Sequence, residues 1–167
     1  DRDLELVMLT HPHADHFTGL FSVLENYKVK SFVSEDLDNK TIGFSSLMDK
    51  IKAQRIPIRF VFAGDRFILK DKVEIEIVGP TREFLQQTSP GGTIGESSEF
   101  ASLETLIKYG KFSALLTGDS QVMELEDALR FASLTQGKLS VLQVPHHGSR
   151  FGLDQAVLDI LNPKLAV

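Results

Sequence analysis

Apolar positions along the chain change their spacing several times, and each spacing predicts a different element. The apolar run at residues 4–9 is bounded by polar residues and predicts a buried strand. The next apolar residues follow the i, i+3, i+4, i+7 spacing of one helical face: Phe17, Leu20, Phe21 and Leu24. A short strand is predicted next at Val29–Val33, followed by a second amphipathic helix at Ser45–Arg55 that ends before Pro57.

The same alternation continues to the end of the chain. Val73–Val78 alternates apolar residues with glutamates, which is typical of a strand with one face toward water, and Gly79–Glu99 is predicted to be a long loop. The other strands are predicted at Ile58–Phe62, Phe67–Lys70, Phe100–Tyr109, Phe112–Thr117, Leu139–Val144 and, unfinished, Leu165–Val167, and the other helices at Gln121–Phe131 and Leu153–Leu161. Strands that alternate with helices and hairpins predict an α/β layered fold with mixed sheets.

Length and composition favour a single domain over residues 1–167. The chain is 42% hydrophobic and 25% charged, and no apolar run approaches the roughly 18 residues of a membrane span. We therefore expect a soluble segment, and its start at Asp1 and unfinished last strand indicate a fragment truncated at both ends. The absence of cysteine excludes disulfides and thiolate ligands, and a net charge of −5 argues against a broad nucleic-acid footprint.

The five histidines lie in two short windows, and the first window has the form H-x-H-x-D-H. It comprises His11, His13, Asp15 and His16, directly after the first predicted strand. In extended chain His11 and His13 point the same way, with α-carbons roughly 6–7 Å apart, so both can bind one cation. Asp15 and His16 stand where strand gives way to helix, and a turn there directs both toward a second cation. The alternative, a polar loop with surface histidines, accounts poorly for four potential ligands in six residues.

Asp119 ends a second motif, Thr117-Gly118-Asp119, which follows an apolar strand. A carboxylate at the rim of a sheet has two oxygens and can bridge two cations. The alternative role for Asp119 is an N-cap of the helix that follows.

The third motif, Pro145–Arg150, also follows a strand. Adjacent side chains in extended chain point to opposite sides, so one of His146 and His147 is expected to bind metal and the other to contact substrate or support a ligand. We favour His147 as the ligand and keep His146 as the alternative. Arg150 is a candidate clamp for a phosphate or an ordinary surface arginine, and Ser149 is a weaker candidate for substrate binding through its backbone N–H.

Together these motifs resemble those of the metallo-β-lactamase superfamily. The PHHGS form at residues 145–149 is similar to the hydrolase domain of ComEC-type DNA-uptake proteins and their free-standing relatives, among them a phosphorylcholine esterase. The resemblance covers nearly the whole chain and includes Gly64-Asp65 ahead of a strand, Val78-Gly79-Pro80 and the Lys108-Tyr109-Gly110 turn.

The resemblance implies a four-layer αββα sandwich that holds two divalent metal ions at one edge. It places His11 and His13 on one ion, Asp15, His16 and one late histidine on the other, and Asp119 between them. Zn²⁺ is the usual metal of the family, and such ligands also suit Mn²⁺ or Fe. The implied reaction is hydrolysis by a metal-bound hydroxide, for which the candidate catalytic residues are Asp15, Asp119 and His146.

Three departures from the family pattern matter, and the first is that family members normally carry strands before the histidine motif and more chain after Val167, which a fragment would lack. Many members have a further metal-binding histidine in mid-chain, and this sequence has none there, so the His11/His13 site is expected to be weaker or completed by water. Where the ComEC branch often has asparagines before a serine, this chain reads Ser97–Ser102, so the substrate contacts of those asparagines are not transferred.

The leading hypothesis is a binuclear metal-dependent hydrolase of phosphodiesters, with nucleic acid or a small phosphodiester as substrate. The alternatives are a hydrolase of a small ester, lactone or β-lactam, and a non-catalytic module stabilised by metal. No membrane contact is expected within the segment, and the sequence leaves the oligomeric state open. Its location is expected to be extracytoplasmic if it belongs to a ComEC-type membrane protein, and cytoplasmic otherwise.

Overall fold

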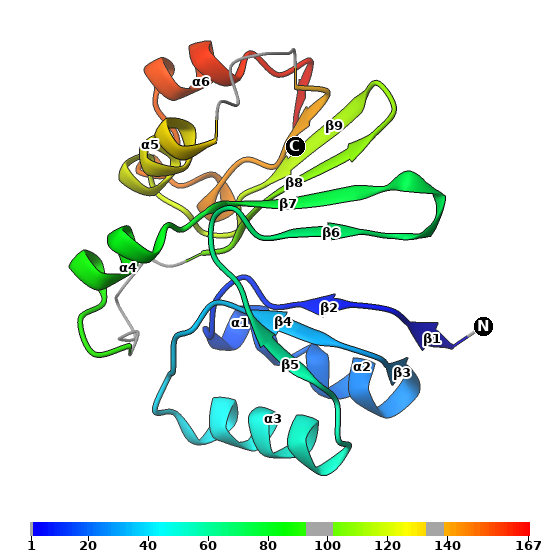
Figure 1. Cartoon of the computed structure of the whole chain (residues 1–167). Coiled ribbons are helices and arrows are strands. Elements are labelled where there is room, and N and C mark those ends of the chain that lie inside the picture. Colours follow the sequence, from blue (N-terminus) through cyan, green and yellow to red (C-terminus); the bar gives the residue numbers. More distant parts are fainter. Residues whose placement is uncertain (1, 93–101, 133–138) are drawn as a thin grey trace.

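The fold was obtained as a computed structural model, which describes residues 2–92, 102–132 and 139–167. Two sheets pack face to face between two layers of helices (Figure 1). The smaller sheet is all parallel and has the order β2 (Val7–Met8), β4 (Phe32–Ser34), β5 (Ile58–Phe60). A further parallel pair precedes it, formed by β1 (Asp3–Leu4) and β3 (Lys28–Val29).

The larger sheet is mixed. Its six strands lie in the order β11 (Leu165–Ala166), β10 (Val141–Leu142), β9 (Phe112–Leu116), β8 (Glu104–Tyr109), β7 (Glu74–Gly79), β6 (Arg66–Ile68). Pairing is antiparallel from β6 to β9 and parallel from β9 to β11. This arrangement confirms the predicted αββα sandwich; the larger sheet is mixed as predicted, whereas the smaller one is parallel throughout.

Helices cover the outer face of each sheet (Figure 1). The smaller sheet is covered by α1 (Ala14–Phe17), α2 (Leu20–Asn26) and α3 (Ile42–Ala53), and the larger sheet by α5 (Val122–Phe131) and α6 (Gln155–Leu161). The helix α4 (Arg82–Thr88) follows β7, and two 3₁₀ turns, η1 (Lys70–Lys72) and η3 (His146–Gly148), complete the described elements. Within the described parts of the chain, no helix is long and apolar enough to cross a membrane.

Three apolar layers hold these four layers together. Leu47 and Ile51 of α3 are fully buried against the smaller sheet, and Leu125 of α5 is buried with Leu142 on the outer face of the larger sheet. A third cluster lies between the sheets and comprises Val33, Val61, Ile77 and Leu103. Because each fully buried aliphatic side chain contributes roughly 1.5–3 kcal/mol, the packing of all three layers fixes the relative position of the sheets.

Several element boundaries differ from the prediction. The strand expected at residues 4–9 is two strands, because β1 pairs with β3 whereas β2 pairs with β4. The first helix is interrupted at residues 18–19, which divide α1 from α2. The helix α3 begins three residues earlier than predicted, since the side chain of Thr41 accepts a hydrogen bond from the backbone N–H of Phe44 and caps it.

The prediction of a loop over Gly79–Glu99 is wrong at residues 82–88, where α4 lies. The side chain of Thr81 caps this helix at the backbone N–H of Phe84, and Phe84 and Leu85 are buried. A seven-residue helix with two buried positions carries too little periodicity to stand out from polar surroundings. The rest of that prediction from residue 93 onward, and the first two residues of the strand predicted at Phe100–Tyr109, lie outside the described residues.

Candidate metal centre

The three sequence motifs meet at one edge of the sandwich because of the strand directions. β9 and β10 are parallel, so the segments that follow them, with Asp119 and with the late histidines, leave the larger sheet at the same edge. β8 is antiparallel to β9, so the residues that precede it, including Ser102, lie at that edge too. The first motif follows β2 of the smaller sheet, which faces the larger sheet across the inner apolar layer.

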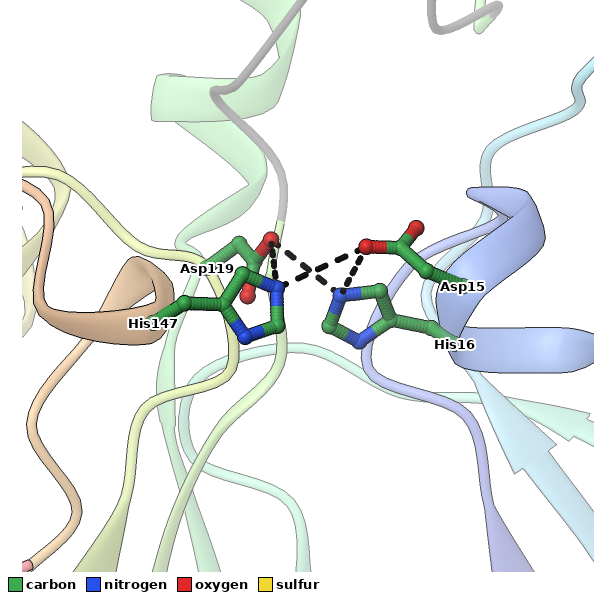
Figure 2. A group of neighbouring side chains, drawn as sticks. All are labelled: Asp15, His16, Asp119 and His147. Atoms are coloured by element: carbon green, nitrogen blue, oxygen red, sulfur yellow. Dashed lines mark ion pairs between the residues drawn. The ribbon is translucent and has the colours of Figure 1, made fainter.

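Four side chains form a compact cluster where these segments meet (Figure 2). The cluster comprises Asp15, His16, Asp119 and His147, and one ligand atom from each lies within 4.8 Å of all the others. Oδ2 of Asp119 is 3.1 Å from Nε2 of His16 and 3.4 Å from Nε2 of His147. Oδ2 of Asp15 is 3.5 Å from each of the same two nitrogens.

His11 and His13 form a second pair beside this cluster. Nε2 of His11 lies 3.0 Å from Nδ1 of His13, and their rings meet edge to face. Two nitrogens bound to one tetrahedral ion at 2.0–2.1 Å are about 3.3 Å apart, so small adjustments would let this pair share a cation. Nε2 of His11 is also 3.9 Å from Oδ2 of Asp119, which places that oxygen between the pair and the cluster.

Buried and exposed sides of the site differ sharply. His11 is 2% exposed, and burial together with the neighbouring imidazoles lowers its pKa to about 3. The side chain of Asp119 is 10% exposed, whereas those of Asp15 and His147 are 64% and 65% exposed. Burial alone would raise the pKa of Asp15, but a backbone N–H and the neighbouring histidines together outweigh it, so that the pKa is lowered. The site is thus closed at His11 and open to solvent at Asp15 and His147.

Sequence reasoning missed three residues that support this site. Hydroxyls of Thr10 and Ser102 each lie 3.2 Å from Nδ1 of His11. A carboxylate oxygen of the fully buried Glu124, in the first turn of α5, accepts the backbone N–H of Ser102 at 2.7 Å. The available signals were weak: Thr10 directly precedes the histidine motif, and Glu124 is an acidic residue in the first turn of a helix, where such residues are common.

The late motif does not adopt the extended conformation that was predicted. His146 and His147 lie in the η3 turn with φ of 51° and 52°, and their ring centroids are 6.1 Å apart. The turn directs His147 into the cluster, whereas His146 is not among its members and has a buried Nδ1 without a hydrogen-bond partner in the described residues.

The two candidate substrate residues lie just beyond this turn. Arg150 is exposed, and its guanidinium carbon lies 4.6 Å from the ring centroid of Phe151. The hydroxyl of Ser149 accepts the backbone N–H of Phe151 at 3.4 Å. Neither side chain belongs to the cluster, so their roles stay predictions.

A comparison with protein families agrees with this geometry. The model of the "Metallo-beta-lactamase superfamily" matches residues 1–167. The chain belongs to this superfamily. Its histidine motif, Asp119 and late histidine pair therefore stand in a metallo-β-lactamase fold.

Among curated proteins, this superfamily member is 27% identical over 173 residues to ComE operon protein 3 of Bacillus subtilis, covering 99% of the chain and 20% of that protein. It is 34% identical over 125 residues to Recombination protein 2 of Haemophilus influenzae, covering 62% of the chain and 15% of that protein. The chain thus spans a fifth or less of the length of these relatives. The similarity to ComEC-type proteins expected from the sequence is confirmed.

Solved structures share the fold at low identity. The E377D mutant of the β-hydroxylase CmlA has a TM-score of 0.63 at 15% identity, with 99% of this chain and 36% of that chain covered. Igni18, a metallo hydrolase from Ignicoccus hospitalis, has a TM-score of 0.57 at 16% identity, with 97% and 61% covered. CmlA of Streptomyces venezuelae, described as a diiron enzyme, gives 0.58 at 14% identity, with 99% and 35% covered.

The residues present fit the metal ions that the superfamily implies. Nε2 of His16 is buried without a hydrogen-bond partner in the described part of the chain, although it faces two carboxylate oxygens. An unpartnered buried nitrogen beside oxygens is costly, and a shared cation would satisfy all of these atoms. The imidazole and carboxylate donors suit zinc, manganese or iron.

Proposed function

We propose that this chain is the catalytic domain of a binuclear metal-dependent hydrolase that cleaves phosphodiesters, with nucleic acid as its substrate. The observation that carries the proposal is the position of Asp119, whose Oδ2 lies 3.1–3.9 Å from Nε2 of three histidines on two separate segments: His11, His16 and His147. An oxygen in that position suits a ligand shared between two cations. Similarity to ComE operon protein 3 and Recombination protein 2 supports a nucleic-acid substrate.

In this proposal each cation has its own ligands and Asp119 belongs to both. Nε2 of His11 and Nδ1 of His13 would hold a buried ion, and Asp15, His16 and His147 would hold a more exposed one. Paired divalent ions lower the pKa of bound water and stabilise negative charge on the attacking and leaving oxygens. Zn²⁺ is the proposed metal, with Mn²⁺ or Fe as the alternatives.

The protein's own side chains then orient the substrate. His146 sits one residue from the cluster without belonging to it, and we assign it to contact with the substrate. Arg150 is exposed and stacks on the ring of Phe151, so it is accessible to an incoming phosphate. Ser149 follows directly on the η3 turn and is a second proposed phosphate contact.

The exposure of the site argues against a purely structural metal. Structural zinc sites are normally closed and four-coordinate, whereas Asp15 and His147 are nearly two-thirds exposed. An open side allows a substrate to approach.

Hydrolysis of a small ester, lactone or β-lactam remains the competing enzymatic function. It gains some support from the net charge of −5, because an acidic surface repels a polyanion. The site of action is proposed to be extracytoplasmic if the whole protein resembles its ComEC-type relatives, and cytoplasmic otherwise.

The proposal is tested by comparing substrates on metal-loaded protein. We expect bis(p-nitrophenyl) phosphate and a fluorescent single-stranded oligonucleotide to be hydrolysed, and p-nitrophenyl acetate and a β-lactam to react much more slowly. Asp119→Ala should reduce phosphodiester turnover at least about 100-fold, since even residues that only support metal ligands cost 10–100-fold. Asp159→Ala, at an exposed carboxylate of α6, is the matched control and should retain turnover. Faster cleavage of the acetate or lactam, or normal turnover by Asp119→Ala, would contradict the proposal.

A further inference from the structure

Ser102 lies behind the candidate metal centre and is almost completely buried, with 1% exposure. Its hydroxyl oxygen accepts the backbone N–H of Asp119 at 2.9 Å and also lies 3.2 Å from Nδ1 of His11. One hydroxyl therefore touches two of the proposed ligands, which come from opposite sheets.

The contacts of the two imidazole rings explain what such a hydroxyl can do. A neutral imidazole carries one ring proton, and a nitrogen that binds metal must be the one without it. Nδ1 of His11 faces only hydroxyls in the described residues, whereas its Nε2 faces His13 and Asp119. Metal-binding histidines almost always donate their other N–H to a nearby acceptor, which fixes ring orientation.

The hydroxyls of Ser102 and Thr10 can each accept the Nδ1 proton of one histidine. Thr10 lies 3.3 Å from Nδ1 of His16 as well as 3.2 Å from Nδ1 of His11. With Ser102 accepting the proton of His11, Thr10 remains to accept that of His16. Each ring can then turn its Nε2 toward Asp119.

The surroundings hold Ser102 in this position. Its backbone N–H donates to Glu124 at 2.7 Å, which ties it to the first turn of α5. On the other side, Gly118 has a φ of 55°, and a Cβ there would lie 2.9 Å from the Ser102 hydroxyl and 3.0 Å from Cβ of Thr10. The turn before Asp119 thus packs against both hydroxyl residues without room for a side chain.

We propose that Ser102 is a positioning residue: its hydroxyl accepts the Nδ1 proton of His11 while it receives the backbone N–H of Asp119, and so it presents Nε2 of His11 and the Asp119 carboxylate to the same cation. The proposal rests on the metal-binding part of the proposed function. It does not depend on which substrate is cleaved.

The tautomer is measured directly by long-range ¹H–¹⁵N NMR of the histidine rings, in the metal-free and the Zn²⁺-loaded protein. We expect His11 to carry its proton on Nδ1 in both states. A His11 proton on Nε2 in the loaded protein would overturn the proposal, since that nitrogen would be unable to bind metal.

Metal affinity provides the second measurement. Ser102→Ala should weaken binding of one Zn²⁺ equivalent about 10–100-fold, the usual cost of losing a partner of a metal ligand, and should alter the Co²⁺ absorption spectrum. Ser102→Thr, which keeps a hydroxyl, should recover affinity. Ser89→Ala is the matched control, because Ser89 is also buried but its hydroxyl has no partner in the described residues.

Unchanged Zn²⁺ affinity and an unchanged Co²⁺ spectrum in a folded Ser102→Ala variant would overturn the proposal, as would an equal loss in Ser89→Ala. If Ser102→Ala does not fold, the NMR measurement on the parent protein decides. Both readouts are independent of turnover. Absence of phosphodiester cleavage in a protein that shows the expected tautomer and affinities would therefore refute only the proposed substrate.

Discussion

Replacing Glu104 by glutamine should change how the stability of the fold depends on pH. Glu104 is fully buried at the start of β8, and neither of its carboxyl oxygens has a hydrogen-bond partner in the described residues. Burial raises its pKa from 4.5 to about 8, against an opposing effect of the Ser120 hydroxyl and with a smaller contribution from the negative charge of Asp127 in the same direction as burial. Between these two pH values the folded chain keeps a proton that the unfolded chain has released.

The sign and size of the effect follow from this difference. Because the folded state binds more protons, the free energy of unfolding falls as pH rises from 4.5 and levels off above 8. At about 1.36 kcal/mol per pKa unit, the loss between pH 5 and pH 8 amounts to roughly 3 to 4 kcal/mol. Glutamine has nearly the same shape and no charge at any of these pH values, so Glu104→Gln should lack this fall.

The measurement is urea unfolding followed by circular dichroism at pH 5, 6, 7 and 8, with a chelator present so that metal binding adds no pH dependence. We expect the free energy of unfolding of Glu104→Gln, relative to the parent, to rise steadily with pH. Glu126→Gln, at an exposed position of α5, should follow the parent at every pH. Parallel curves for Glu104→Gln and the parent would refute the inference that Glu104 is held protonated.

Three further substitutions test the late motif and the helix that follows it. His147→Ala should lower bound metal by about one equivalent in elemental analysis, whereas His146→Ala should keep the parental content, because of these two late histidines it is His147 that faces both carboxylates of the cluster; the reverse result would make His146 the ligand. Asp154→Ala should lower the free energy of unfolding by about 1 kcal/mol, since the Asp154 side chain caps α6 at the backbone N–H of Val157; urea unfolding checks this, and an unchanged midpoint would contradict it.

The sequence predicted the elements whose apolar periodicity is long and regular. In β7 the alternation places Ile75 and Ile77 inside with Glu74 exposed, as expected. The sequence did not predict which strands pair. Residues 4–9 form two strands rather than one because β1 pairs with β3 whereas β2 pairs with β4, and these partners are distant in the sequence. The helix α4 was missed for a related reason: its stability comes from a threonine cap and two buried residues, which a short window does not distinguish from a loop.

Only those features of the site that follow from residue types and their spacing in the sequence could be predicted. The residues of a short motif such as His11–His16 are close in space because they are close in the sequence, so their grouping could be predicted. The structure also brings Asp119 and His147 to Asp15 and His16. The conformation of the late motif could not be predicted, because positive φ angles at two consecutive residues other than glycine are uncommon. The sequence did not single out Ser102 either, since its importance arises from contacts with His11 and Asp119, which lie 91 and 17 positions away along the chain.

The candidate site depends on how the two sheets pack against each other, because its residues come from both. Asp15 and His16 follow the smaller sheet, whereas Asp119 and His147 follow the larger one. The backbone N–H of Leu103 donates to the carbonyl of Thr10 at 2.8 Å, which joins the two halves beside the cluster. A cation held by both halves binds only the folded chain, and at a hundredfold excess over its Kd it would stabilise the fold by about 2.7 kcal/mol. Loss of a ligand therefore weakens the fold of the metal-loaded protein together with its activity, so turnover of any ligand variant has to be read against its unfolding curve at the same metal concentration.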